Sequence, residues 1–162
     1  AALPRPIMLY VGRVAVEKNV AAFLAADHPG SKVVVGDGPA RAALEARFPQ
    51  AHFLGACFGE ALAAAYRTAD VLVFPSRTDT FGLVMIEALA CGTPVAAFPV
   101  AGPLDVLTPE SGAMNENLPA AIDRALALDP RRCAELGARH TWRASAEQFL
   151  AALAPVPASL AA

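Results

Sequence analysis

The sequence has few of the features that extracellular, zinc-binding or nucleic-acid-binding proteins need. Only three cysteines occur among 162 residues, and Cys57, Cys91 and Cys133 lie far apart without a CxxC or Cys/His spacing. An odd number of scattered thiols predicts neither a disulfide framework nor a zinc site, and it favours a reducing compartment. We therefore expect a cytoplasmic location.

Clusters of basic residues and long apolar runs are also missing. The net charge is −2, and no basic run is interleaved with aromatic residues, so nucleic acid is not an expected partner. Pro, Gly, Arg or Asp interrupts every apolar run before it reaches membrane-spanning length, and no charged signal-peptide segment opens the chain. A 56% apolar and 17% charged composition instead predicts one globular core.

Short apolar runs alternate with segments of helical periodicity along most of the chain. The expected strands are 7–11, 32–35, 52–54, 71–74 and 95–98, and the expected helices are 18–26, 39–48, 59–68, 83–91, 118–128 and 130–153. Apolar strands separated by helices predict an α/β fold, with a Rossmann-like parallel sheet covered by helices on both faces.

The later part of the chain has a weaker pattern. We expect a turn at Gly102-Pro103 and a loop over 108–116, and we expect Trp142 and Phe149, at helical spacing, to lie in the core. Residues 1–5 are interpreted as a linker remnant, 6–153 as the domain and 154–162 as a tail.

Polar segments follow three of the expected strands. Gly12-Arg13 and Lys18 follow the first strand, Gly36-Asp37-Gly38 the second, and the segment from Asp79 to Glu87 the fourth. Ligands of open parallel sheets bind at the carboxyl ends of the strands. Two cations beside the helix start at Gly82 fit a dianion such as a diphosphate, which is typical of a nucleotide.

Each of these residues also has a purely structural interpretation. Arg13 and Lys18 could be solvated loop charges, Asp79 could stabilise the helix dipole, and Glu87 could be an exposed helix residue. Gly36 and Gly38 suit a tight turn as well as a close ligand approach. The histidines, namely His28, His52 and His140, are expected to be structural or exposed, and Cys91 to be a small apolar filler.

Five segments, taken in order, resemble the carboxyl-terminal, donor-binding half of family 4 retaining glycosyltransferases of the GT-B fold. They are VGRVAVEKN, VVVGDGP, HFLG, DVLVFPS and SRTDTFGLVMIEALACGTPV. The segment SRTDTFGLV, followed by FPVAGPLDVL, is most similar to the corresponding segments of bacterial members of mannosyltransferase type, which use a GDP-linked sugar.

The resemblance implies a role for each matching residue. It assigns Arg13 and Lys18 to the donor diphosphate, next to Gly12, and Glu87 to the ribose hydroxyls. It assigns the backbone amides of Phe81, Gly82 and Leu83 to phosphate and sugar, and Asp79 to hydroxyls of the transferred sugar. It implies a donor such as a GDP-sugar or UDP-sugar, no cofactor and no metal, since Arg13 and Lys18 neutralise the leaving diphosphate.

Two departures from the family pattern are visible. The family pairs two glutamates eight residues apart, whereas the first acid here is Asp79, one methylene shorter. The second departure is that we expect this chain to lack the amino-terminal, acceptor-binding domain of the family. We therefore expect the chain to bind a donor without transferring sugar. The resemblance also allows a peripheral contact of the full-length enzyme with the inner face of a membrane.

Two other functions stay open at this stage. A dinucleotide-dependent oxidoreductase would share the architecture, but the first loop reads GRVAVE instead of GxGxxG. A non-catalytic nucleotide-binding module would share the same pocket.

Overall fold

The computed structural model describes residues 2–153, and its centre is one parallel sheet of six strands. The strands are β1 (Ile7–Val11), β2 (Ser31–Val35), β3 (His52–Gly55), β4 (Val71–Phe74), β5 (Val95–Ala97) and β6 (Gly112–Met114). Their order across the sheet is β3-β2-β1-β4-β5-β6. The chain therefore changes direction between β1 and β4, the topological switch point at which such sheets bind ligands.

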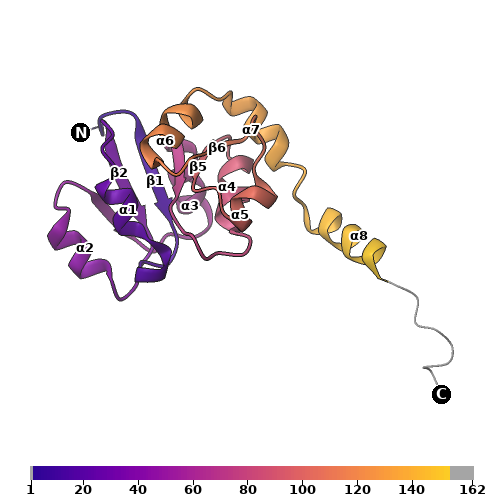
Figure 1. The fold of residues 1–162 in the computed structure, drawn as a ribbon, viewed down its shortest axis with the longest axis horizontal. Helices are drawn as coiled ribbons and strands as arrows, with labels where there is room; N and C mark the ends of the chain where they lie inside the picture. Colours follow the sequence, from indigo (N-terminus) through magenta and orange to yellow (C-terminus); the bar gives the residue numbers. More distant parts are fainter. Residues whose placement is uncertain (1, 154–162) are drawn as a thin grey trace, which may run out of the picture.

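Helices cover both faces of the sheet (Figure 1). They are α1 (Val20–Ala25), α2 (Arg41–Arg47), α3 (Gly59–Thr68), α4 (Leu83–Ala90), α5 (Ala101–Val106), α6 (Leu118–Leu126), α7 (Pro130–Gly137) and α8 (Trp142–Ala152), with a 3₁₀ turn, η1 (Val16–Lys18), before α1. Alternate side chains of β1 divide the core, since Met8 packs with α1, α2 and α6 while Leu9 packs with α3, α4 and α7. The predicted Rossmann-like sheet with helices on both faces is confirmed.

Two elements were not expected from the sequence. The segment 108–116 contains β6, which pairs with β5 from Val95–Gly112 to Ala97–Met114. The Gly102-Pro103 pair lies inside α5 rather than in a turn. The predicted loop and turn are therefore wrong: long-range pairing with a neighbouring strand forms β6, although its three residues carry little strand propensity of their own.

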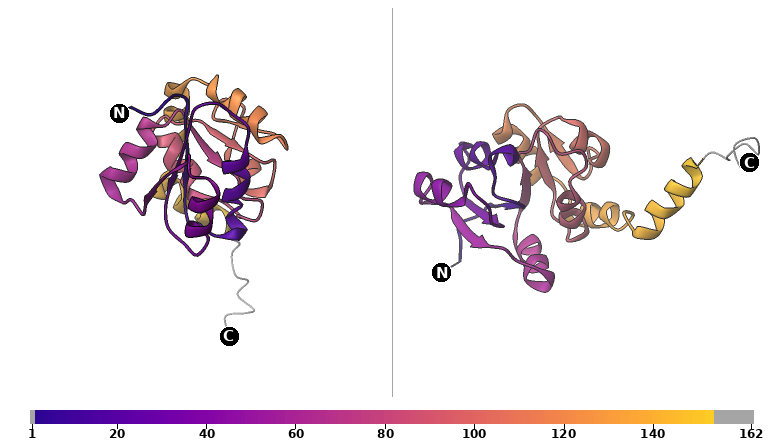
Figure 2. Two further views of the ribbon diagram at one scale, coloured as in Figure 1. Left: turned by 90° about the vertical axis from the view of Figure 1, so that its left-hand side faces the viewer. Right: turned by 90° about the horizontal axis from the view of Figure 1, so that it is seen from below.

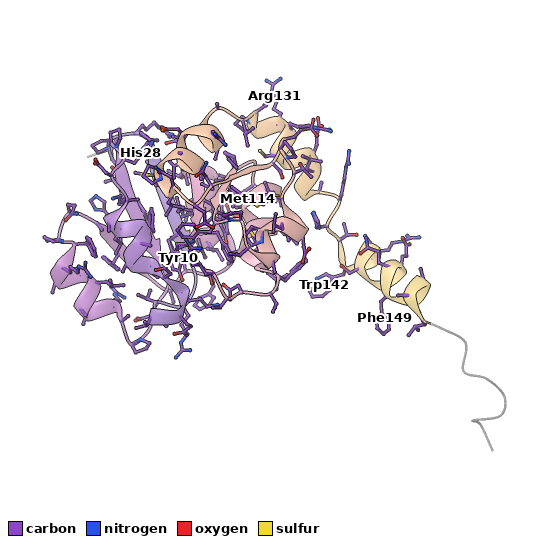
Figure 3. The ribbon with its side chains drawn as sticks, viewed as in Figure 1. Tyr10, His28, Met114, Arg131, Trp142 and Phe149 are labelled. Carbon is purple, nitrogen blue, oxygen red and sulfur yellow. The ribbon has the colours of Figure 1, made fainter. Side chains whose placement is uncertain are left out.

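The last helix differs from the prediction as well. The expected helical segment 130–153 is divided into α7 and α8 by the residues around His140. In Figure 1 and in the right-hand view of Figure 2, α8 extends away from the sheet. Trp142 is 89% exposed and Phe149 65% exposed, and Figure 3 shows both side chains on the projecting helix. The prediction that they belong to the core is wrong, because their helical spacing does not determine what α8 packs against.

The predicted tail at 154–162 lies outside the described residues. At the other end, the Arg5 side chain pairs with Asp70, and Asp70 accepts a hydrogen bond from the Ile7 amide at 2.6 Å. These contacts attach the segment before β1 to the sheet. None of the helices in residues 2–153 has the length and apolar character needed to cross a bilayer.

Candidate functional site

A cavity of about 270 Å³ opens at the switch point of the sheet. The loop after β1 and the loop after β4 form its walls, and both belong to the carboxyl ends of their strands. Predicted site residues make up much of the lining, namely Gly12, Arg13, Lys18, Asp79, Gly82 and Leu83. The topology thus brings together residues that are about 70 positions apart in the sequence.

Within this cavity, Lys18 and Asp79 form an ion pair. Their side chains are 28% and 22% exposed, so neither is a freely solvated loop charge. Arg13 also lines the cavity, but its guanidinium pairs with Glu17 at 3.2 Å, where both side chains are largely exposed. Of the two cations, Lys18 is therefore the more firmly placed inside the site.

Backbone and buried polar contacts hold the β1 loop in position. The Tyr10 hydroxyl donates to the Arg13 carbonyl oxygen at 2.8 Å, and burial, followed by the nearby carboxylates of Asp79 and Glu17, raises the pKa of that phenol. The Asn19 side chain donates to the Pro75 carbonyl oxygen at 3.1 Å, which joins this loop to the one after β4. Sequence reasoning did not identify either residue. The Asn19 contact depends on the order of the strands, because Pro75 follows β4, whereas the Tyr10 contact is local and depends on how the loop after β1 folds back.

The glycines after β2 have a structural role. A Cβ atom at Gly36 would lie 1.8 Å from the carbonyl oxygen of Gly12, and one at Gly38 would lie 2.4 Å from that of Val14. The Gly36-Asp37-Gly38 turn thus packs against the loop that carries Arg13. In the described part of the chain, neither of these two glycines lines the cavity, so the tight-packing interpretation is the better one.

Helix α4 begins at the cavity, directly after Gly82. Gly82 has a φ of 80°, a conformation that a residue with a side chain adopts at a cost. Among the described residues, no side chain caps the start of this helix. Its first amide groups and the positive end of its dipole therefore suit an anion placed in the cavity.

A second cavity of about 660 Å³ lies between α4, α5 and the start of α8. Its lining includes Phe81, Glu87 and Asp105, and it shares Leu83 with the first cavity. The two acids that the sequence places eight residues apart thus face different cavities, Asp79 the first and Glu87 the second. Glu87 is exposed, and its Oε2 atom accepts a hydrogen bond from the Tyr66 hydroxyl at 2.8 Å.

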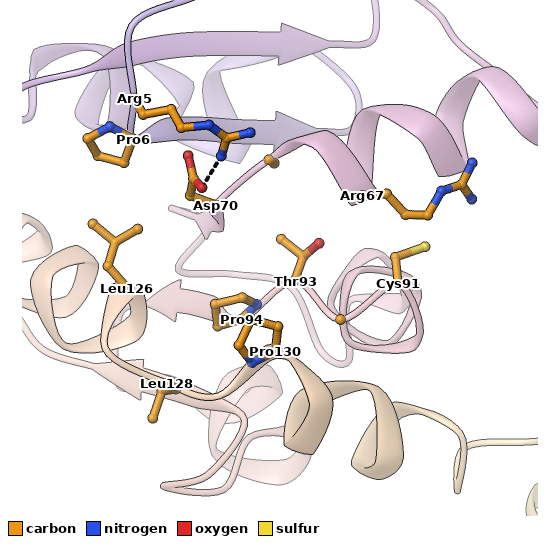
Figure 4. Close-up of a pocket in the computed structure, with 12 residues that line it drawn as sticks. Arg5, Pro6, Arg67, Asp70, Cys91, Thr93, Pro94, Leu126, Leu128 and Pro130 are labelled. Carbon is orange, nitrogen blue, oxygen red and sulfur yellow. Dashed lines mark hydrogen bonds and ion pairs between the residues drawn. The ribbon is translucent and has the colours of Figure 1, made fainter.

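Another cavity of about 660 Å³ lies at the opposite, amino edge of the strands (Figure 4). Its cations are both paired with acids, Arg5 with Asp70 and Arg67 with Glu60. Cys91 lines it, and burial raises the pKa of that thiol. No residue that the sequence analysis assigned to the nucleotide sugar lies in the described lining of this cavity.

Metal ligands do not cluster within the described residues. No three His, Cys, Asp or Glu side chains in this part of the chain come close enough together to hold a metal ion. All three cysteines are free thiols. In the described lining of the switch-point cavity, the charged side chains are Arg13, Lys18 and Asp79, and Arg13 pairs with Glu17 beside it.

Known proteins similar to this chain include both sequence relatives and solved structures. The chain is 42% identical over 127 residues to a GDP-mannose-dependent alpha-mannosyltransferase of Mycobacterium tuberculosis, a match that covers 73% of this chain and 34% of that protein. It is 34% identical over 177 residues to a GDP-mannose-dependent alpha-(1-6)-phosphatidylinositol dimannoside mannosyltransferase of the same species, covering 98% of this chain and 46% of the relative.

The fold also matches a solved structure, that of the pneumococcal O-GlcNAc transferase GtfA in complex with UDP and GlcNAc. The TM-score is 0.72 at 17% sequence identity, and the match covers 91% of this chain and 36% of the other. The matches therefore cover between about a third and a half of the length of these three proteins.

The family model described as glycosyl transferases group 1 matches residues 5–128, which include every residue of the two loops at the switch point. This match confirms the resemblance seen in the sequence. It favours a glycosyltransferase over the dinucleotide-dependent oxidoreductase that the sequence left open. The chain belongs to the group 1 glycosyltransferases and has the Rossmann-like domain of a GT-B enzyme.

Proposed function

We propose that this chain binds a nucleoside diphosphate sugar as the donor of a retaining glycosyl transfer. The observation that carries the proposal is the single cavity at the switch point, where Lys18, Arg13 and the start of α4 meet. Cations and helix amides together are suited to a diphosphate, and they stabilise the negative charge that grows on it as the sugar leaves. Because Arg13 and Lys18 can neutralise this charge, the proposal needs no metal.

The second cavity and Glu87 support a placement for the rest of the donor. Leu83 joins the two cavities, so a donor with its diphosphate at the start of α4 can extend in two directions. We assign the transferred sugar to the side of Asp79 and the ribose to the side of Glu87. The names of the mycobacterial relatives favour GDP-mannose, whereas the solved neighbour was bound to UDP.

The proposal for the whole protein includes groups outside this chain. The matched relatives are two to three times longer, and we propose that acceptor-binding groups belong to such additional sequence. The isolated chain is then a donor-binding unit that transfers no sugar. A cytoplasmic location, and a contact of the longer protein with a membrane surface, stay predictions.

A thermal-shift panel tests donor binding directly. The purified chain is heated with GDP, UDP, ADP or NAD at one common concentration, so that a tighter ligand gives a larger shift. A ligand present at about 100 times its dissociation constant stabilises the folded state by roughly 2.7 kcal/mol. We expect a shift with GDP or UDP. The variant Lys18→Ala should lose most of that shift, and Arg143→Ala, which changes an exposed cation on α8, should keep it. A shift with NAD alone, or with none of the four, would contradict the proposal.

A further inference from the structure

Tyr66 is a buried residue whose polar atom contacts the exposed Glu87. It lies near the end of α3, is 1% exposed, and packs among apolar residues of α4 such as Met85 and Leu89. A phenol hydroxyl buried in such a cluster is costly unless it has a hydrogen-bond partner. Glu87 Oε2, at 2.8 Å, is that partner.

The contact leaves Glu87 able to bind a ligand. A carboxylate has about four acceptor positions on its two oxygens, and Tyr66 uses one of them. In the described part of the chain, Glu87 Oε1 has no hydrogen-bond partner, and the Glu87 side chain lines the second cavity. Two ligand hydroxyls can therefore be accepted while the Tyr66 bond stays in place.

The bond also fixes a side chain that would otherwise be free to rotate. An exposed glutamate samples several rotamers, and binding a ligand orders them at an entropic cost. Tyr66 is held independently by Thr93, whose hydroxyl donates to the Tyr66 backbone oxygen at 2.7 Å. Burial, followed by the bond to Glu87, raises the pKa of the Tyr66 phenol above its ordinary value, which is itself well above neutral pH, and the protonated hydroxyl donates to Glu87 Oε2.

We propose that Tyr66 is a positioning residue, which orients the Glu87 carboxylate toward the ribose hydroxyls of the donor nucleotide. The inference rests on the proposed function, because it presupposes that a nucleotide binds with its ribose at Glu87. Tyr66 itself lines neither the first nor the second cavity. The inference therefore gives α3, the helix that carries Tyr66, an indirect part in nucleotide recognition.

The test compares Tyr66→Phe with the parent chain, using a nucleotide with and without ribose hydroxyls. The probes are GDP or UDP, whichever binds more tightly in the panel above, and its 2′,3′-dideoxy counterpart, both measured by calorimetric titration. We expect the parent to prefer the hydroxylated nucleotide. Tyr66→Phe should lower the affinity for the hydroxylated nucleotide by about three- to tenfold and should change the affinity for the dideoxy form by no more than about twofold.

Three further variants separate positioning from a loss of stability. Thr93→Val removes the hydrogen bond from the Thr93 hydroxyl to the Tyr66 backbone oxygen but keeps the phenol. It should therefore preserve the parent's ratio of affinities, even where it lowers the unfolding midpoint. Glu87→Ala should abolish the preference, and adding Tyr66→Phe to it should change nothing more.

The outcomes distinguish the inference from the function beneath it. If the parent binds neither GDP nor UDP, the proposed function fails and the inference fails with it. If the parent prefers the hydroxylated nucleotide and Tyr66→Phe keeps the same ratio, only the role of Tyr66 is wrong. If the parent binds both forms equally, the assignment of ribose to Glu87 is wrong while donor binding stands.

Discussion

The Lys18 ammonium group, which follows β1, pairs with the Asp79 carboxylate, which follows β4 and lies 61 residues later in the chain. The pair connects the two loops of the switch point and lies in the lining of the cavity between them. A diphosphate entering that cavity competes with Asp79 for the same cation. Asp79, which we assign to the sugar, and Lys18, which we assign to the diphosphate, are thus coupled before any ligand binds.

This coupling predicts that Asp79→Asn affects two ligands differently. Removing the carboxylate's charge releases Lys18, so the affinity for GDP should stay equal or rise by up to about fivefold, the usual limit for a partly exposed ion pair. The affinity for GDP-mannose relative to GDP should fall, because the sugar loses an acceptor. Calorimetric titration of both ligands measures the ratio. Glu147→Gln, an acid-to-amide change in an exposed pair on α8, serves as the matched control. Equal losses for the two ligands would show that Asp79 does not distinguish sugar from diphosphate.

The two cations should act on the diphosphate more than on a monophosphate. A charge-assisted hydrogen bond to phosphate contributes about 1.5–3 kcal/mol. Lys18→Ala and Arg13→Ala should therefore each lower the affinity for GDP more than the affinity for GMP. The effect should be larger for Lys18, because its side chain is less exposed than that of Arg13. Because exposed charges are screened beyond about 10 Å at 0.1 M salt, the loss at Arg13 should shrink as salt is raised. Titrations at two salt concentrations check both statements, and unchanged GDP affinity in both variants would remove the basic pair from the site.

Gly82 should be needed for folding as well as for the site. A Cβ atom there would lie 2.8 Å from Phe74 Cζ and 3.0 Å from Met85 Cε, at a φ of 80°. Gly59 also has a positive φ, of 55°, but a Cβ atom would meet no other atom within 4 Å among the described residues. Gly59→Ala should therefore cost about 1–2 kcal/mol of unfolding free energy, from backbone strain alone. Gly82→Ala should cost about 1–3 kcal/mol more, because it also overpacks. Urea unfolding of the two variants gives the difference, and equal losses would place Gly82 in open space.

Much of the fold could be predicted because β1, β2 and β4 are apolar runs that glycine, aspartate or proline interrupts. Those signals are local, and the structure confirms the strands and the helices between them to within about two residues. The strand order could not be predicted, since nothing in the chain between β3 and β4 indicates that β4 pairs with β1 rather than with β3. The missed strand β6 and helix α5 depend on the same non-local packing.

The candidate site shows the same division. Lys18, Asp79 and Gly82 carry recognisable motifs, so the sequence identified them, and the topology then placed them around one cavity. That Asp79 and Glu87 face different cavities follows from the direction of α4, and the Tyr66 contact follows from how α3 packs on it. A lone tyrosine at the end of a helix gives no sequence signal of that contact, because its partner lies 21 residues away.

The exposure of α8 leads to a prediction about stability that separates this helix from the core. Trp142→Ala should change the unfolding free energy by no more than about 0.5 kcal/mol, the usual range for surface positions, because the ring is 89% exposed. Phe23→Ala is the matched comparison, a truncation of another large aromatic ring that is 0% exposed between α1 and the sheet, and it should cost about 3–5 kcal/mol. Denaturant unfolding of the two variants, followed by circular dichroism, measures both values on the same chain. A loss of unfolding free energy at Trp142 comparable to that at Phe23 would mean that α8 packs against the domain in solution. The prediction from helical spacing that Trp142 belongs to the core would then be correct.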